Sequence, residues 1–282
     1  MTQTIQIIKA SGEKAPFNPE KLRRSLHRAG AGKDRSEAIA RAVALQLHDG
    51  MSTREIYRLA HRLLRKEARP AAARYSLKQA LLGLGPSGYP FERFVGKLFE
   101  ADGYKVQTGQ LREGRCVPHE IDVLAEADGK VIVAECKFHN RQHLVSDVKI
   151  PLYIHSRFRD LQAGFLSGPE GQNRQVEGWI FTNTRFTEDA LQYGRCAGLH
   201  LIAWNTPFDF GLGDWIDRTG LHPLSCLSSL TQGEKDRLFG HNIVLVREIL
   251  ETPDLLAPLR LAPERQQAVL REAESIAALR PD

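Results

Sequence analysis

Hydrophobic and polar positions in the first third of the chain follow a short strand pattern and then a helical pattern. Residues 4–9 (TIQIIK) predict a strand, the stretch 11–14 is turn-like, and Phe17 closes a small hairpin. Asn18-Pro19 supplies a helix N-cap followed by proline at the first helical position. Apolar residues then recur at helical spacing, which predicts helices over 20–29, 36–47, a stretch capped by Ser52 or Thr53, and 70–82.

The pattern changes after residues 83–88 (GLGPSG), which have the composition of a linker. Helices and strands then alternate, which is typical of a mixed α/β domain around a central sheet. We expect Pro151 to interrupt any single helix in the mixed segment 143–165. The predicted elements are a helix over 90–101, strands over 104–108, 120–125 and 130–138, a strand over 176–182, a helix over 187–197 and a strand over 199–204.

Strand patterns end near Leu224, and the remaining chain is predicted to be helical. We therefore expect a multi-domain α+β protein with domains at 1–85, 88–207 and 208–282. The C-terminal helices are predicted over 231–239, 243–251 and 263–278. Their turn at 240–242 permits a weak helix-hairpin-helix interpretation with DNA backbone contact, and packing or dimerisation is the alternative.

Charge is distributed unevenly along the 282 residues, although the net charge is only +5. Residues 1–86 carry 17 Lys and Arg against 7 Asp and Glu, and the rest carries 22 against 27. A basic N-terminal third favours a partner with phosphate groups, and the alternative is a solvated helical face of arginines. The 4 cysteines form no CxxC pair, and we find neither a secretory signal nor a membrane span, so we expect a cytoplasmic protein with reduced thiols.

The most informative stretch is HEIDVLAEADGKVIVAECKF, residues 119–138, which is typical of a β-hairpin. Strand side chains alternate, so Glu135 and Lys137 share one face of the second strand, and Asp122 comes from the neighbouring strand. Two acids and a lysine therefore converge at one end of a sheet. Carboxylates are the ligands that Mg²⁺ prefers, and an adjacent ammonium can orient a water and stabilise a charged transition state.

This arrangement resembles the D…ExK signature of the PD-(D/E)xK nuclease superfamily. GYPFERFVGKLFEADGYKV (88–106), EIDVL, VAECK and the stretch 179–205 together resemble its Mrr-like restriction endonuclease branch. The resemblance implies a restriction-endonuclease-like α/β/α domain and Mg²⁺-dependent (or Mn²⁺-dependent) hydrolysis of double-stranded DNA. It implies Asp122 and Glu135 as metal ligands, Lys137 as the residue that positions or activates water, and Glu92 as a helper from the preceding helix.

Several of these residues also permit simpler interpretations. A Glu-x-Lys on a strand is often only an exposed ion pair. Glu120 is a bystander or a substitute ligand, and His139 and His143 are surface or phosphate-contacting residues rather than metal ligands. Cys136 alternates to the opposite face, which favours a core thiol over a nucleophile.

The N-terminal segment, residues 4–85, resembles the ATP-cone, the nucleotide-binding regulatory domain of many ribonucleotide reductases and of a related repressor family. The resemblance lies in IIKASGEKAPFNPEKLRRSLHRAG, DGMSTREIYRLAHRLL and AAARYSLKQAL. It implies ATP or dATP as an allosteric ligand, bound between a β-hairpin and a four-helix unit. The residues implied for this ligand are Lys9, Phe17, Lys21, Leu22, Thr53 and Lys78, with Ile8 beside the base and Arg74 as an alternative to Lys78.

Together these resemblances predict a nucleotide-regulated DNA endonuclease that acts against foreign or modified DNA. Because cutting both strands needs two active sites, we expect a homo-oligomer. Walker A spacing is missing, so we do not expect the nucleotide to be hydrolysed. The alternatives are a nucleotide-sensing DNA-binding regulator with an inactive nuclease fold, and a reductase-linked regulatory subunit.

Overall fold

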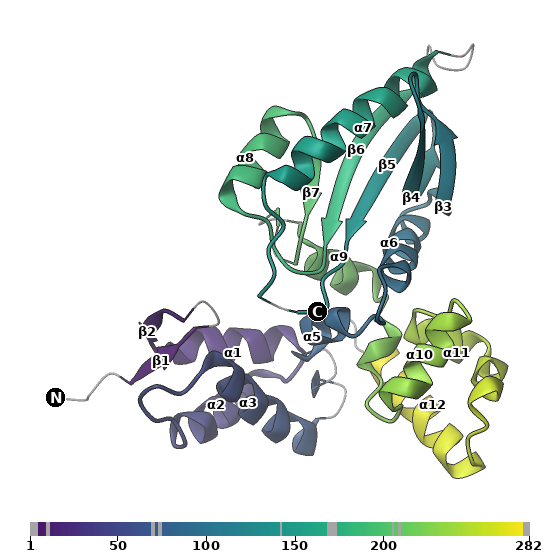
Figure 1. The fold of residues 1–282 in the computed structure, drawn as a ribbon. Coiled ribbons are helices and arrows are strands. Elements are labelled where there is room, and N and C mark those ends of the chain that lie inside the picture. Colours follow the sequence, from purple (N-terminus) through teal and green to yellow (C-terminus); the bar gives the residue numbers. More distant parts are fainter. Residues whose placement is uncertain are drawn as a thin grey trace.

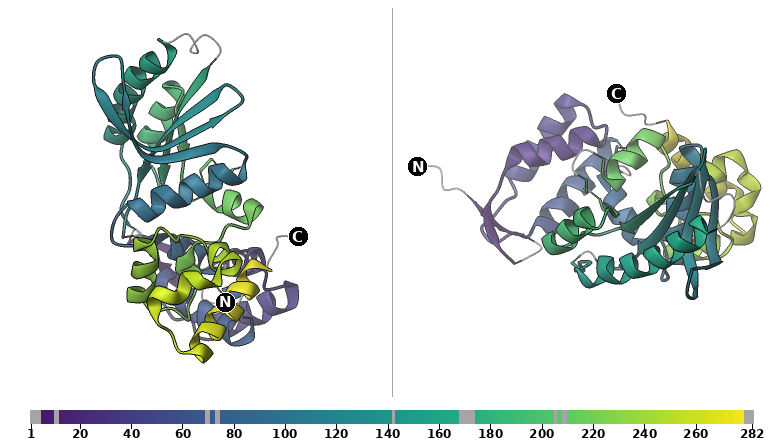
Figure 2. Two further views of the ribbon diagram at one scale, coloured as in Figure 1. Left: turned by 90° about the vertical axis from the view of Figure 1, so that its right-hand side faces the viewer. Right: turned by 90° about the horizontal axis from the view of Figure 1, so that it is seen from above.

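The computed structural model describes residues 5–9, 12–68, 71–72, 75–141, 143–167, 174–204, 206–207 and 210–278. A five-stranded sheet with its helices stands above a helical base (Figures 1 and 2). The N-terminal hairpin and helices form one side of this base, and the C-terminal helices form the other. The multi-domain α+β fold predicted from the sequence is confirmed.

The N-terminal part begins with an antiparallel hairpin and continues with helices whose apolar faces meet. Asn18 caps the first helix by accepting a hydrogen bond from the Lys21 N–H at 3.2 Å. Ser52 caps the third helix and forms a capping box with Glu55. The elements are β1 (Gln6–Ile8), β2 (Lys14–Pro16), α1 (Pro19–Arg28), α2 (Lys33–Ala44) and α3 (Thr53–Glu67). Residue 4 of the predicted strand and residue 11 of the predicted turn lie outside the described part.

The fourth helix of this segment is placed differently from its prediction over 70–82. Helix α5 spans Leu77–Leu82, residues 71–72 are helical, and residues 69, 70, 73 and 74 lie outside the described part. Leu77 and Leu81 of α5 are buried in the core of the central domain, whereas the N-terminal helices have a core of their own. Helix α5 therefore packs with the sheet domain and not with the helices that precede it.

The central domain has three layers, with helices on both faces of a sheet in the order β3-β4-β5-β6-β7. The first three strands are antiparallel, and β6 and β7 continue in parallel with β5. Helix α6 packs on one face, and α7 and α8 pack on the other. The elements are α6 (Tyr89–Ala101), β3 (Lys105–Glu113), β4 (Pro118–Ala127), β5 (Lys130–Lys137), α7 (Lys149–Leu166), β6 (Gln175–Thr182), α8 (Glu188–Cys196) and β7 (His200–Ile202).

Two expectations about these elements were wrong. Strand β3 does not end near residue 108, because pairing with β4 continues as far as Glu113 opposite Pro118. Pro151 does not interrupt α7, because it occupies the third position of the helix. The first N–H groups of any helix have no partner within it, so the missing N–H of proline costs no hydrogen bond at that position.

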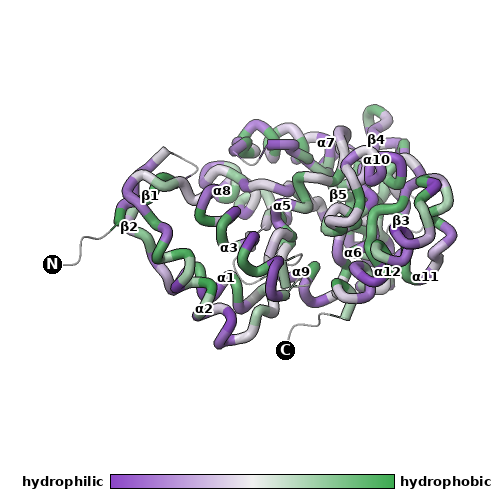
Figure 3. Tube along the Cα trace, turned by 90° about the horizontal axis from the view of Figure 1, so that it is seen from below, coloured by the Kyte–Doolittle hydropathy of each residue, from purple (hydrophilic) through white to green (hydrophobic). Residues whose placement is uncertain are grey.

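The C-terminal part is helical and shares the core that lies beneath α6. Helix α9 was not predicted, because it is short and follows the strand region directly. Seen from below, hydrophilic and hydrophobic positions alternate along the helices, which fits helices that bury one face (Figure 3). The elements are α9 (Leu212–Thr219), η2 (Leu224–Cys226), α10 (Gln232–Gly240), α11 (Val246–Glu251), η3 (Pro253–Leu259) and α12 (Pro263–Ala277). Among the helices that the structure describes, none has the length and apolar character needed to cross a membrane.

Candidate functional site

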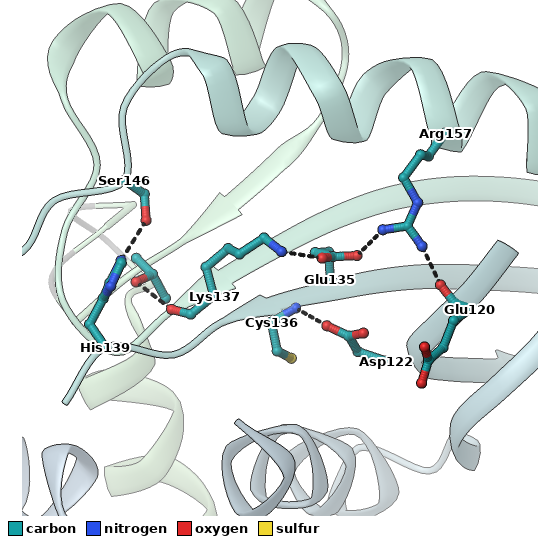
Figure 4. Close-up of polar contacts among 9 residues, drawn as sticks. Glu120, Asp122, Glu135, Cys136, Lys137, His139, Ser146 and Arg157 are labelled. Atoms are coloured by element: carbon teal, nitrogen blue, oxygen red, sulfur yellow. Dashed lines mark hydrogen bonds and ion pairs between the residues drawn. The ribbon is translucent and has the colours of Figure 1, made fainter. Parts of the chain in front are cut away.

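The sheet opens where strands β4 and β5 part. Their antiparallel register begins at Ala127 opposite Lys130 and ends at Val123 opposite Ala134. At the next position of β4, the Asp122 carboxylate accepts a hydrogen bond from the Cys136 backbone N–H at 2.7 Å (Figure 4). This hydrogen bond holds the carboxylate of β4 against the strand segment that carries Glu135 and Lys137.

Glu135 is the most enclosed acid at this opening, with 8% of its surface exposed. The Lys137 ammonium donates to one carboxylate oxygen of Glu135, and Arg157 on α7 donates to the other at 2.8 Å. The Arg157 guanidinium also donates to the backbone carbonyl of Glu120 on β4 (Figure 4). Arg157 therefore links α7 to both strands across the opening.

Glu92 on α6 contributes a further carboxylate to the electrostatics of the opening. Burial and the charges of Asp122, Glu120 and Glu135 raise the pKa of Glu92 to about 7. Burial, followed by the charge of Glu135, raises the pKa of Asp122 to about 6, and the hydrogen bond from Cys136 opposes this. The carboxylates are thus held close enough to repel one another, and a cation among them would relieve that repulsion.

The donor set at the opening fits a hard divalent cation. Mg²⁺ is usually bound by one or two carboxylates and retains several waters, and Asp122 and Glu135 form such a pair on neighbouring strands. Lys137 and Arg157 supply positive charge to Glu135 in this structure. Among the described residues, no group of three or more His, Cys, Asp or Glu side chains is arranged to hold a metal ion.

The backbone after β5 is fixed by Asn183, which is 1% exposed. Its amide oxygen accepts from the His139 N–H at 2.8 Å, and its amide nitrogen donates to the His139 carbonyl at 2.8 Å. The same nitrogen donates to the Leu81 carbonyl of α5 at 3.4 Å. The His139 ring forms a hydrogen bond with the Ser146 hydroxyl at 3.2 Å. Asn183 therefore connects the backbone of His139, two residues beyond Lys137, to α5, the helix that follows the N-terminal part.

Two other candidate residues are placed away from the carboxylate pair. The Glu120 side chain is exposed, and its backbone carbonyl accepts from Arg157. The Cys136 side chain is buried in the core, and burial raises the pKa of its thiol far above the ordinary value. A thiol with so little thiolate character is a poor nucleophile.

A second candidate site is a pocket of about 1310 Å³ between the N-terminal part and the central domain. Of the residues predicted to bind a nucleotide, the structure brings four to the wall of this pocket: Lys9, Lys21, Thr53 and Lys78, together with Ile8. Leu22 is instead buried in the N-terminal core, and Phe17 packs against that core. Arg74 lies outside the described residues.

The opposite wall of the pocket comes from the central domain and α9. It includes Asn140, Arg141 and His143 from the segment after β5, and Trp204 at the end of the β7 region. Basic side chains outnumber acids among the described lining residues: Lys9, Lys21, Arg24, Arg54, Lys78 and Arg141 against Asp214 and Asp217. Burial, and then the charge of nearby Arg185, lowers the pKa of Lys78. The pocket is therefore electrostatically suited to an anion.

Arg157, Asn183 and Arg141 are among the residues of these sites that were not identified from the sequence. Arg157 carried a weak signal, because it borders the buried helical positions Ile154 and Phe158 and is itself charged. Asn183 and Arg141 carried none. They gain their partners only when segments distant in the sequence are brought together.

Models of three known families match consecutive stretches of the chain. An ATP cone domain matches residues 5–79, a restriction endonuclease domain matches 86–206, and an AF1548-like C-terminal domain matches 222–277. An uncharacterized protein of Archaeoglobus fulgidus is 31% identical over 183 residues, which cover 64% of this chain and 99% of that protein. The chain therefore contains an ATP cone domain followed by a restriction endonuclease domain. The predicted combination of an ATP cone with an Mrr-like nuclease domain is thereby confirmed.

The chain also resembles a solved structure. The crystal structure of AF1548, a protein of unknown function, superposes with a TM-score of 0.56 and 30% sequence identity. The match covers 68% of this chain and 98% of that one. Roughly a third of the chain thus has no counterpart in that structure.

Proposed function

We propose that this protein is a nucleotide-regulated endonuclease that hydrolyses phosphodiester bonds of double-stranded DNA with Mg²⁺ or Mn²⁺. The observation that carries the proposal is that Asp122, Glu135 and Lys137 lie together where β4 and β5 part. Glu92 lies near enough for the charges of these acids to raise its pKa. The restriction endonuclease match over residues 86–206 supports the same chemistry. On this basis we also propose a role against foreign or modified DNA.

Each residue at the opening has a separate task in this proposal. Asp122 and Glu135 would hold the divalent cation, which supplies positive charge to the scissile phosphate when it is bound. Lys137, on the same face as Glu135, would release that carboxylate and donate to the attacking water or to a phosphate oxygen. Glu92 would accept a hydrogen bond from water on the α6 side.

The cone would bind ATP or dATP as a regulator. Lys9, Lys21 and Lys78 place ammonium groups around one pocket, and Thr53 adds a hydroxyl at the N-terminus of α3. Because one active site cuts one strand at a time, we propose a homo-oligomer for cleavage of both strands.

The test of the proposed function is plasmid cleavage with Mg²⁺ or Mn²⁺, with and without ATP and dATP. Replacing Asp122 with asparagine removes a ligand charge while keeping the side-chain shape, and should lower the cleavage rate by roughly 10³-fold or more. Glu126→Gln is the matched control, because Glu126 lies on the same strand and pairs with Arg174 away from the opening. The control should cleave like the wild type.

DNA binding, measured by gel shift, separates loss of chemistry from loss of folding. Asp122→Asn should still bind DNA. Unchanged cleavage by Asp122→Asn would refute the assigned metal site. Binding by the wild type without cleavage in any combination of metal and nucleotide would instead identify a DNA-binding regulator with an inactive nuclease fold.

A further inference from the structure

The candidate nucleotide pocket is built by two domains. It is lined by basic residues of the N-terminal part and by Arg141 and His143, which belong to the segment between β5 and α7 of the nuclease domain. Figure 1 shows this segment reaching from the sheet toward α1 and α5. A ligand that fills the pocket therefore contacts both the regulatory and the catalytic part of the chain.

Arg141 is also near the catalytic strand along the sequence. Three residues separate it from Lys137, and the middle one, His139, has both backbone groups held by Asn183. Asn183 in turn donates to the Leu81 carbonyl of α5, the helix that brings Lys78 to the pocket. Two routes thus lead from the pocket to the end of β5. One follows the chain from Arg141, and the other runs from α5 through the hydrogen bonds of Asn183.

The charges in the pocket explain why an anion would act on both routes. Basic side chains from both domains line the pocket together with the acids Asp214 and Asp217, and Lys9 also pairs with Glu13 at 3.0 Å. Asp214 is engaged in capping α9, where it accepts from the Gly211 N–H at 3.0 Å. A bound polyphosphate would attract the basic side chains of both domains at once.

We propose that the nuclease domain completes the nucleotide site: Arg141 binds the phosphates of ATP or dATP together with Lys9, Lys21 and Lys78. The bound nucleotide then fixes the segment that follows Lys137, and this contact transmits nucleotide binding to the catalytic strand. The inference rests on the proposed function, because it names the regulation of the same nuclease site. One of the residues that bind the nucleotide therefore lies outside the cone, in the catalytic domain.

Nucleotide affinity of the full-length chain tests the direct contact. Calorimetric titration with ATP and with dATP should show that Arg141→Ala weakens binding by about 10-fold or more, and that Arg141→Glu weakens it further. Arg195→Ala is the matched control, because it removes one arginine charge from the same domain at an exposed position paired with Glu188. Binding by this control should change by less than about 2-fold.

Cleavage provides the second readout, as the ratio of rates with and without nucleotide. At a nucleotide concentration that saturates the wild type, Arg141→Ala should move this ratio toward one, and Arg195→Ala should leave it at the wild-type value. If the wild type binds nucleotide and Arg141→Ala binds it equally well, the inference is overturned while the proposed function stands. If the wild type binds neither ATP nor dATP, both the inference and nucleotide regulation are overturned, although cleavage remains a separate result.

Discussion

At the scale of single residues, the acids of the opening are held by groups that carry a positive charge or donate a hydrogen bond. Glu135 contacts Lys137 and Arg157, and Asp122 accepts from the Cys136 N–H. A buried carboxylate is costly unless such partners satisfy it. The same contacts fix the orientation of both proposed metal ligands on their neighbouring strands.

Arg157→Ala should lower the free energy of unfolding by about 1–3 kcal/mol, because it leaves buried Glu135 with a single cationic partner and removes the donor of the Glu120 carbonyl. The measurement is urea denaturation in the presence of EDTA, so that no metal compensates. Arg159→Ala, at an exposed position of the same helix, should change stability by less than about 0.5 kcal/mol. Equal losses in the two variants would contradict the assigned role of Arg157.

At the scale of elements, side-chain caps decide where several helices begin. Ser52 with Glu55 and Thr231 with Glu234 form capping boxes at α3 and α10. Glu234 has an additional partner, since Arg265 on α12 donates to it at 2.8 Å. Glu234 therefore both caps α10 and connects α10 to α12 through its ion pair with Arg265.

The Glu234 contact predicts a pH dependence of stability. Hydrogen bonding from Arg265, together with the cap at Thr231, lowers the pKa of Glu234 from 4.5 to about 2. The charged form is therefore favoured by folding, so its contribution is complete above about pH 4.5 and is lost as the pH falls toward about 2. Glu234→Gln should cost on the order of 1–2 kcal/mol at neutral pH.

The measurement is urea denaturation of the wild type and Glu234→Gln between pH 7 and pH 4. The stability gap between the two should narrow as the pH drops below about 4.5. Asp236→Asn on the same helix is the control, because Asp236 accepts a hydrogen bond from the exposed Gln232 amide at 2.9 Å, whereas Arg265 binds Glu234. A gap that widens toward acid would refute the role of the Glu234 charge.

At the scale of the whole molecule, α5 joins the cone to the rest of the chain. Its residues Leu77 and Leu81 lie in the large core shared by α6, the sheet and the C-terminal helices. Ser225 of η2 donates to the Ala80 carbonyl of α5 at 2.7 Å. The sequence linker at 83–88 therefore follows a helix that is already packed into the central core.

Hydrogen exchange of two leucine variants should locate this boundary. Leu81→Ala should raise amide exchange in α6 and in α10–α12, because Leu81 is fully buried in the large core, and should cost about 2–5 kcal/mol there. Leu64→Ala, equally buried in the N-terminal core, should raise exchange in α1–α3 instead. If both variants loosened the same helices, the two cores would not be separate units.

Local patterns in the sequence were sufficient for much of the architecture. Helical spacing and a cap at Ser52 or Thr53 predicted α3, and alternation predicted β5. The D…ExK motif predicted Asp122, Glu135 and Lys137 as one group. Pro151 misled the prediction, because its effect depends on its position within the helix, and that position is set by where α7 begins. Prediction succeeded for features whose physical cause lies entirely within a short stretch of the chain.

Contacts between distant segments were decided only by the tertiary structure. The sequence by itself determined the domain order, the carboxylate pair on neighbouring strands and the basic character of the cone, because each depends on residue type and local periodicity. Arg157 beside Glu135, Asn183 between His139 and α5, and Arg141 in the pocket of the cone depend instead on how α7, β6 and α5 pack. Packing depends on which apolar faces meet across the whole chain, and no local pattern specifies that.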